Sequence, residues 1–172
     1  MTLSLQGQVA FITGGGSGLG AAAARRLAAD GAIVAINDLS LEAAKKVADE
    51  LGGLAFAFDV TDSTAFQNAV DTCVAQLGRL DIMINNAGIA PQDAASKMDL
   101  VMDNMGKRMA GNISDMEPTN YLLDLSDENW DRMIKVHLYG TFYGCKAALK
   151  HMQPQRSGRI INISSVLGLY PA

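Results

Sequence analysis

One stretch near the start of the chain constrains its fold most, a short apolar run followed at once by glycines. The run Val9–Ile12 is typical of a buried strand, and glycine then occupies most positions from Gly14 to Gly20. Residues 21–30 follow as a helix that ends before Gly31, a glycine placed as a C-cap. The free N–H groups and positive dipole end of such a helix suit a pyrophosphate. The alternative is a glycine turn that joins a strand to a helix and binds nothing.

A second apolar run, Ile33–Asp38, ends in an acid. Asp38 lies 18 residues beyond Gly20, close to the spacing at which an acid reaches the adenosine ribose of a bound dinucleotide. Its carboxylate would accept hydrogen bonds from the ribose hydroxyls and would repel a 2′-phosphate. No Arg or Lys lies in the glycine turn or just after Asp38. The sequence therefore favours NAD over NADP, and the alternative is that Asp38 only caps the next helix.

The chain goes on to alternate helices and strands. Strands are expected at Leu54–Phe58 and Ile82–Asn85, separated by helices with apolar residues at i+3 and i+4 spacings. This alternation predicts an α/β fold, a Rossmann-type doubly wound parallel sheet with helices on both faces and strand order 3-2-1-4-5. Ligands bind at the carboxyl ends of such strands. The segments expected there are Thr13–Gly20, Asp38, Asp59–Val60 and Asn86–Gly88.

Several motifs, in this order, resemble those of the short-chain dehydrogenase/reductase family. They are Thr13-Gly-x-x-x-Gly-x-Gly20, Asp59-Val60, Asn85-Asn-Ala-Gly88 and Arg159-Ile-Ile-Asn-Ile-Ser-Ser165. The resemblance implies an NAD(H)-dependent oxidoreductase that interconverts a secondary alcohol and a ketone by hydride transfer. It also implies a set of residues that hold the cofactor. These are Gly14, Ser17, Gly18, Leu19 and Gly20, then Asp38 and Leu39, then Asp59 and Val60, and finally Asn86, Ala87 and Gly88.

The resemblance also points to two residues for the chemistry. Ser165, after an expected strand over 159–163, would donate a hydrogen bond to the substrate oxygen, although a serine at a strand end is often only a turn residue. His137 stands where the family carries an asparagine that holds a water of the proton relay. A histidine titrates near neutral pH and could hold that water, or it could be a core residue bonded to a backbone carbonyl. A histidine here resembles family members that are similar to 3-hydroxyacyl-CoA and 17β-hydroxysteroid dehydrogenases. With the methionine-rich segment described below, this resemblance implies a bulky apolar substrate, steroid-like or 3-hydroxyacyl-like.

The catalytic Tyr-x-x-x-Lys pair of the family is not found in the 172 residues. Tyr170 is at the wrong distance from Ser165, with Pro171 next and no lysine after it. We therefore expect a single dehydrogenase domain over 1–172 that is truncated at its C-terminus, and the resemblance implies a homo-oligomer, a dimer or tetramer, for the full-length protein. The alternative is a non-catalytic NAD(H)-binding module or inactive fragment, which would bind NADH without turnover.

Residues 89–125 look like an insertion, because this connection is usually shorter in the family. Four methionines at helical spacing lie along one face of a predicted helix; they are Met98, Met102, Met105 and Met109. They could pack a surface helix onto the body, form a lid over an apolar ligand, or make a contact between subunits. Ser126 is then the expected N-cap of a long helix to about Met152. Its expected buried stripe is Trp130, Met133, Ile134, Leu138, Thr141, Phe142, Cys145, Ala148 and Leu149.

Composition narrows the class of protein. Apolar residues make up 49% and charged residues 19%, as in ordinary globular domains, and the net charge of −4 argues against nucleic acid or anionic membrane as a partner. No apolar run reaches the roughly 18 residues that a membrane span needs. Cys73 and Cys145 fall in helical patterns, which favours buried thiols in the cytoplasm over a disulfide. We expect a small-molecule substrate and no metal site.

Overall fold

The computed structural model describes residues 4–90 and 97–165 of the chain. They belong to two compact units, one formed by residues 1–88 with 135–172 and the other by residues 89–134. The first unit contains the sheet and the residues expected to bind the cofactor. Tyr170, which was compared with the family's catalytic tyrosine, lies outside the described residues.

The first unit is built on a five-stranded parallel sheet with the order β3-β2-β1-β4-β5. The strands are β1 (Val9–Ile12), β2 (Ile33–Asp38), β3 (Leu54–Ala57), β4 (Ile82–Asn85) and β5 (Arg159–Asn162). Fold class and strand order are as the sequence predicts, and the prediction is confirmed. Every neighbouring pair of strands is parallel; Ile12 of β1, for example, pairs with Ile36 of β2 on one side and Ile84 of β4 on the other. The carboxyl ends of all five strands therefore lie at one edge of the sheet.

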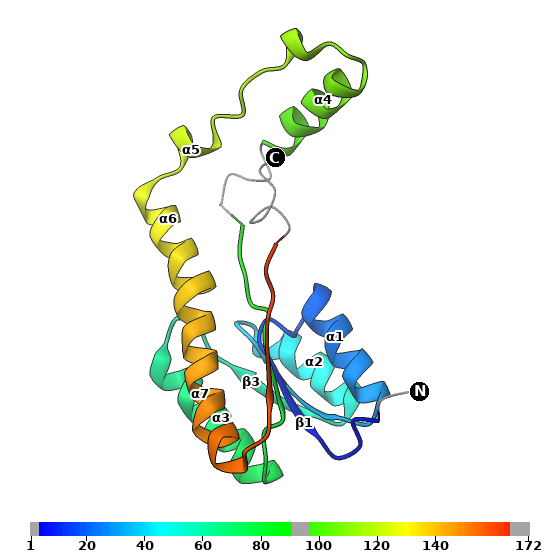
Figure 1. The fold of residues 1–172 in the computed structure, drawn as a ribbon, viewed down its shortest axis with the longest axis vertical. Helices are drawn as coiled ribbons and strands as arrows, with labels where there is room; N and C mark the ends of the chain where they lie inside the picture. The colour runs from blue at the N-terminus through cyan, green and yellow to red at the C-terminus, as the bar shows by residue number, and fades with distance from the viewer. Residues whose placement is uncertain (1–3, 91–96, 166–172) are drawn as a thin grey trace. The chain divides into compact units, whose positions relative to one another are not determined.

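Helices cover both faces of this sheet (Figure 1). Helices α1 (Gly18–Ala29) and α2 (Leu41–Leu51) lie on one face, and α3 (Ser63–Leu77) and α7 (Gly140–Gln155) lie on the other. Helix α2 begins where Ser40 Oγ accepts from the N–H of Ala43 at 3.2 Å. Helix α3 begins where Asp62 Oδ1 accepts from the N–H groups of Thr64 and Ala65, both at 2.9 Å. These side chains satisfy N–H groups that have no partner within their own helix.

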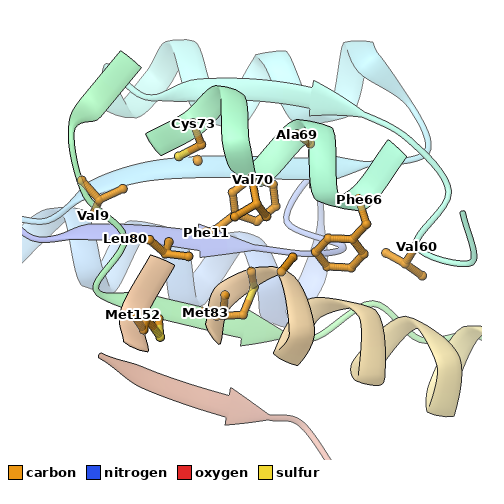
Figure 2. Close-up of a cluster of buried hydrophobic side chains, with 13 residues drawn as sticks. Val9, Phe11, Val60, Phe66, Ala69, Val70, Cys73, Leu80, Met83 and Met152 are labelled. Carbon is orange, nitrogen blue, oxygen red and sulfur yellow. The ribbon is translucent and has the colours of Figure 1, made fainter. Parts of the chain in front are cut away.

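The larger core lies between the sheet and helices α3 and α7 (Figure 2). Phe11 of β1 is fully buried at its centre, and its ring stacks on that of Phe66 of α3, with centroids 6.4 Å apart. Met83 of β4 and Met152 of α7 belong to the same cluster. Burying a side chain of this size stabilises the fold by roughly 1.5–3 kcal/mol. This packing therefore holds β1 and β4, the two strands that lead into the predicted site, against a rigid layer of helices.

The amino edge of the sheet is tied together by Asp81, which is 5% exposed. Its Oδ2 accepts from the Val9 N–H at 2.9 Å, and Arg79 donates to both carboxylate oxygens at 2.7 Å. Burial alone would raise the pKa of the Asp81 carboxyl, but the Arg79 hydrogen bond, the Val9 N–H and the Arg79 charge lower that pKa below its usual value. Its backbone bonds to both Val9 and Arg159. Asp81 thus fixes the starts of β1, β4 and β5 at the edge opposite the predicted site.

The expected long helix is interrupted. Ser126 does cap its start, since its Oγ accepts from the Asn129 N–H at 3.2 Å. Helix α6 (Asp127–Ile134) is followed by a π-helical turn, η2 (Lys135–Tyr139), and then by α7. A π-helical turn inside a helix is rare and is found frequently at functional sites. The interruption was not visible in the hydrophobic pattern of the sequence.

The predicted buried stripe of this helix is wrong for four of its large side chains, whereas Met133 and Ile134 are partly buried. Those left half or more exposed are Trp130 (52%), Leu138 (59%), Phe142 (59%) and Leu149 (51%). Ala148 is buried as predicted, and the other buried residues of α7 are Gly140, Gly144, Ala147 and Met152. Small residues are required because the helix backbone comes very close to its neighbours: a Cβ added at Gly140 would lie only 2.9 Å from Val60 Cγ2.

The second unit contains α4 (Met98–Met109), a 3₁₀ turn η1 (Ile113–Asp115), α5 (Tyr121–Asp124) and α6. Asn104 is buried and bonds twice to the backbone of Glu117, donating to its carbonyl at 2.6 Å and accepting from its N–H at 3.0 Å. Lys97 Nζ lies 2.6 Å from Asp124 Oδ2 and 5.0 Å from the centre of the Tyr121 ring. Residues 116–124 are therefore held against α4 by specific polar contacts.

The four methionines of α4 are not the residues that pack it within its unit. Their exposed fractions are 52% for Met98, 59% for Met102, 50% for Met105 and 78% for Met109. The helix turns the face with Leu100, Val101 and Asn104 inward instead. The methionines thus form an apolar stripe on the surface of the described second unit.

Candidate functional site

The ends of β1 and β4 are tied together by Thr13 and Asn86. Thr13 is 2% exposed, and its Oγ1 accepts from the N–H groups of Asn86 and Ala87, both at 3.0 Å. In return, Asn86 Nδ2 donates to the carbonyls of Thr13 at 2.9 Å and Gly14 at 3.1 Å. Every polar group in this exchange is partly or fully buried, so the pairing is costly to break. The turn after β1 and the turn after β4 are therefore one rigid structure.

The glycines of the first turn serve packing as well as access. A Cβ added at Gly20 would overlap the Gly14 carbonyl oxygen and would lie 2.6 Å from Asn86 Nδ2. A Cβ at Gly14 would lie 3.0 Å from the Cα of Ala87. Gly14 and Gly18 also have positive φ angles, +61° and +52°, which favour glycine. These glycines are thus required for the packing and backbone conformation of the turn, whether or not the turn also binds a ligand.

Helix α1 begins without a side-chain cap. Ser17 is in the N-cap position with φ −155°, but its side chain makes no capping hydrogen bond, in contrast to Ser40 at α2 and Asp62 at α3. The first-turn N–H groups, including those of Gly18, Leu19 and Gly20, have no acceptor within their own helix. Leu19 is 77% exposed, so this turn is open to solvent. Such a helix start favours an anion, because its N–H groups and dipole point toward it.

The Asp38 carboxylate is held by two backbone N–H groups. Oδ2 accepts from Gly16 at 3.1 Å and Oδ1 accepts from Ser40 at 3.1 Å. Because Ser40 itself caps α2, Asp38 is not the cap of that helix. Each carboxylate oxygen keeps a lone pair that can accept a further hydrogen bond, such as one from a hydroxyl. Leu39, next in the chain, is 69% exposed and lies beside this acid in sequence.

The end of β3 joins the same edge of the sheet. Asn37 Nδ2 donates to the Phe58 carbonyl at 3.1 Å, which connects the ends of β2 and β3. The Asp59 carboxylate accepts from the Thr61 N–H at 2.9 Å. Val60 is 7% exposed and packs against Gly140 of α7. Asp59 and Val60 therefore stand at the carboxyl edge, as the sequence predicts for that segment.

His137 and Ser165 approach this edge from other elements. His137 belongs to the π-helical turn, and a Cβ added at Gly88 would lie 2.9 Å from its ring atom Cε1. The imidazole thus borders the Asn86–Gly88 turn. Ser165 follows β5, whose Asn162 pairs with Asn85 of β4, so the chain leaves the sheet at the same edge. The structure places both residues at the same edge of the sheet as the residues expected to hold the cofactor.

The described residues contain neither a metal-binding cluster nor a membrane-spanning helix. Nowhere in residues 4–90 and 97–165 do three or more His, Cys, Asp or Glu side chains gather in a way that could hold a metal ion. Of the helices described in those ranges, none has the length and apolar character needed to cross a bilayer.

Sequence reasoning missed two features of the site. Thr13 was placed in a motif, but its buried hydroxyl, which joins the two turns, was given no role. A threonine that ends a buried strand just before a glycine turn is a signal that could have suggested it. The second feature is the side-chain pair of Asn85 and Asn162, joined at 2.8 Å. Their contact depends on the register of β4 and β5, which sequence spacing does not give.

A family model described as "short chain dehydrogenase" matches residues 8–172. The chain belongs to this family. Family members bind nicotinamide dinucleotides, generally NAD or NADP. The residues of this chain fit such a group. The uncapped start of α1, the Asp38 carboxylate and the glycines of the first turn lie at one edge of the sheet.

Curated relatives cover almost all of this chain. It is 37% identical to the 2,5-dichloro-2,5-cyclohexadiene-1,4-diol dehydrogenase of Sphingobium indicum over 99% of the chain and 60% of the relative. It is 34% identical to the D-threitol dehydrogenase of Mycolicibacterium smegmatis, over 94% and 54% respectively. It is 36% identical to the 3-alpha-(or 20-beta)-hydroxysteroid dehydrogenase of Mycobacterium tuberculosis, over 98% and 55%. The chain thus spans less than two thirds of the length of these relatives.

Proposed function

We propose that the protein is an NAD(H)-dependent oxidoreductase that interconverts a secondary alcohol and a ketone by hydride transfer. The observation that carries the proposal is the Asp38 carboxylate, oriented at the end of β2 by the Gly16 N–H of the glycine turn. An acid in this position accepts hydrogen bonds from ribose hydroxyls and repels a 2′-phosphate, which favours NAD over NADP. The names of the relatives, all dehydrogenases, support the reaction class.

The bound cofactor would supply the hydride chemistry, and the chain would bind and orient it. The uncapped start of α1, with Gly14 and Ser17 to Gly20, would hold the phosphates. Asp38 and Leu39 would contact the adenosine ribose, and Asp59 and Val60 would flank the adenine. Asn86, Ala87 and Gly88 would line the ribose next to the nicotinamide. Asn86 is well suited to a fixed position, since Thr13 and Gly14 already hold its side chain.

Ser165 would act on the substrate. Its hydroxyl would donate a hydrogen bond to the substrate oxygen and stabilise the negative charge that develops there. His137 would hold a proton or a relay water at a ring nitrogen, in place of the family's asparagine. Its position beside Gly88, on the nicotinamide side of the proposed cofactor site, supports this role. In the full-length protein a Tyr-x-x-x-Lys pair beyond residue 172 would complete the site.

The substrate class is proposed from the relatives and the insertion. The hydroxysteroid dehydrogenase favours a bulky apolar alcohol, steroid-like or 3-hydroxyacyl-like, and the exposed methionines of α4 offer an apolar surface for one. The insertion over 89–125 would act as a lid for such a substrate or as a contact between subunits. The full-length protein would work in the cytoplasm as a homo-oligomer, a dimer or tetramer. A second function, NAD(H) binding without catalysis, follows if the isolated protein lacks the Tyr-x-x-x-Lys pair.

The experiment is a fluorescence titration with NADH and with NADPH. We expect saturable binding that is at least tenfold tighter for NADH, a difference of about 1.4 kcal/mol. Asp38→Ala should reduce the preference for NADH over NADPH, because it removes the carboxylate that distinguishes a ribose 2′-hydroxyl from a 2′-phosphate. Asp49→Ala is the matched control, since it removes the same charge from an exposed position of α2 that pairs only with Lys45 in the described structure. An unchanged preference in Asp38→Ala would refute the role of Asp38, and absence of binding would refute the proposed function.

Turnover separates the two functions. The same preparation is assayed with NAD and a panel of secondary alcohols, and its intact mass is compared with 18.2 kDa. NAD-dependent oxidation of any alcohol excludes the non-catalytic module. Binding without oxidation, in a protein whose mass shows no further residues, supports it.

A further inference from the structure

Asn85 is the last residue of β4 and the residue that precedes the Asn86–Gly88 turn. It is 5% exposed. Its Nδ2 donates to Asn162 Oδ1 of β5 at 2.8 Å and to Cys145 Sγ of α7 at 3.6 Å. Cys145 Sγ also lies 3.7 Å from Asn162 Oδ1. One buried amide thus joins two strands and a helix.

The other side of this amide faces Gly144 of α7. Among the described residues, Asn85 Oδ1 is the buried side-chain polar atom without a hydrogen-bond partner, and a Cβ added at Gly144 would overlap it. Glycine at this position therefore lets the backbone of α7 approach the Asn85 side chain. With Nδ2 donating to Asn162 Oδ1, Oδ1 of the same amide lies on the side of Gly144. A buried carbonyl oxygen kept without an N–H donor calls for an explanation beyond stability.

The elements that meet at Asn85 are those that carry the proposed site. Strand β4 continues into the Asn86–Gly88 turn, and β5 continues toward Ser165. Helix α7 follows directly on the π-helical turn with His137. The Ile163 N–H also donates to the Asn85 carbonyl at 3.0 Å, which extends the pairing of the two strands beyond Asn162. A shift of any one of these elements would have to break a contact of the Asn85 side chain.

We propose that Asn85 is a positioning residue that couples the cofactor turn after β4 to helix α7 and to the end of β5, acting through Asn162, Cys145 and Gly144. The inference rests on the proposed function, because the coupling is expressed when NADH contacts the Asn86–Gly88 turn. Binding there restricts the end of β4, and the restriction passes through one amide to Cys145. The cysteine is then the reporter of the coupling and has no role in the chemistry.

The experiment measures the rate at which N-ethylmaleimide labels each cysteine, with and without saturating NADH, by peptide mass spectrometry. Cys145 is half-buried and should be labelled in the native protein. We expect NADH to slow its labelling by about threefold or more, because separation of Asn85 and Asn162 from the thiol becomes rarer. Cys73 is the internal control. It is fully buried, and burial raises the pKa of its thiol to about 12, so its labelling reports global unfolding.

Cys73 separates local coupling from simple stabilisation by a ligand. NADH stabilises the whole fold by mass action, and that effect slows only labelling that requires unfolding, which is the labelling of Cys73. Cys145 is labelled in the native protein, so stabilisation of the fold alone leaves its labelling rate unchanged. A Cys145 labelling rate that NADH does not change, while the labelling of Cys73 is slowed, would overturn the proposal.

Two substitutions at Asn162 form a matched pair. Asn162→Asp keeps an oxygen that accepts from Asn85 Nδ2, and it should preserve the NADH-dependent protection of Cys145. Asn162→Leu replaces the amide with a side chain of similar size that has no acceptor. This variant should abolish the NADH-dependent protection of Cys145 while NADH still binds. Asn162 is exposed in the described structure, so both variants are expected to fold. Gly144→Ala, which forces a methyl group against Asn85 Oδ1, provides a third variant with the same expected loss.

Failure of this inference and failure of the proposed function look different. If NADH does not bind, the proposed function fails and both labelling rates are unchanged in every variant. If NADH binds saturably and Cys145 is not protected, or is protected equally in Asn162→Leu and Asn162→Asp, the positioning role of Asn85 is refuted alone.

Discussion

Replacing Gly20 with alanine tests the packing of the glycine turn directly. The new methyl group would overlap the Gly14 carbonyl oxygen and would lie 2.6 Å from Asn86 Nδ2. The Gly14 oxygen is a backbone atom, so it cannot yield as the end of a flexible side chain could. The turn or the start of α1 must move, and the two hydrogen bonds from Asn86 Nδ2, at 2.9 and 3.1 Å, are the contacts that the movement breaks.

The expected cost follows from these contacts. Each broken hydrogen bond is worth about 1 kcal/mol of stability, and forcing a methyl group into a packed site costs about 1–3 kcal/mol. Gly20→Ala should therefore lower the free energy of unfolding by about 3–5 kcal/mol. Gly18→Ala is the matched control in the same turn, because a Cβ there meets no atom within 4 Å and only its φ of +52° is unfavourable. That variant should lose about 1–2 kcal/mol.

The assay is urea unfolding followed by far-UV circular dichroism. With a slope of about 1–3 kcal/mol per molar urea, Gly20→Ala should move the midpoint down by at least about 1 M. Trp130 is the single tryptophan and lies in the second unit, so its fluorescence gives a separate transition for comparison. A Gly20→Ala protein as stable as wild type, or more stable than Gly18→Ala, would refute the claim that this turn is closed too tightly for a side chain.

Two further predictions concern the sheet and the insertion. The folded-state pKa of Asp81 is lowered, so its stabilising contribution is present above the unfolded pKa of about 4 and is lost as pH falls through the folded value. Asp81→Asn should therefore have a lower free energy of unfolding than wild type at pH 7, and this free energy should fall less between pH 5 and pH 2, as measured by urea titrations. The same fall in both proteins would contradict this prediction. For the exposed methionines, Met102→Lys with Met105→Lys should dissociate the oligomer in light scattering if α4 is a subunit contact. The same pair should instead raise the KM of the full-length enzyme for an apolar alcohol if α4 is a lid, and no change in either measurement would refute both roles.

The sheet could be predicted from sequence because its strands are short apolar runs bounded by turn residues. The expected bounds Val9–Ile12, Ile33–Asp38 and Ile82–Asn85 coincide with β1, β2 and β4. In a parallel sheet covered on both faces, burial alone selects such runs, and glycines or acids mark where they stop. Ser126 was predicted as a cap for a similarly local reason, since a cap depends on residues within one turn.

The helix after Ser126 could not be predicted as well, because its packing depends on distance to other elements. A hydrophobic pattern favours Leu138 and Phe142 as buried residues, yet the backbone of α7 approaches the sheet so closely that Gly140 and Gly144 fill the contact. Likewise, the contact of Asn85 with Cys145 joins residues 60 positions apart and follows from the placement of α7 on β4. Periodicity carries no information on such distances.

The uncapped start of α1 has a consequence for the evolution and engineering of this protein. A side-chain cap is typically worth about 1 kcal/mol, and α2 and α3 each have one where α1 has none. A substitution at Ser17 that supplied a cap would stabilise the empty protein and would occupy the N–H groups that an anion needs. Selection for thermal stability alone would therefore tend to close this helix start, whereas the proposed binding of cofactor phosphates would keep it open at the expense of stability.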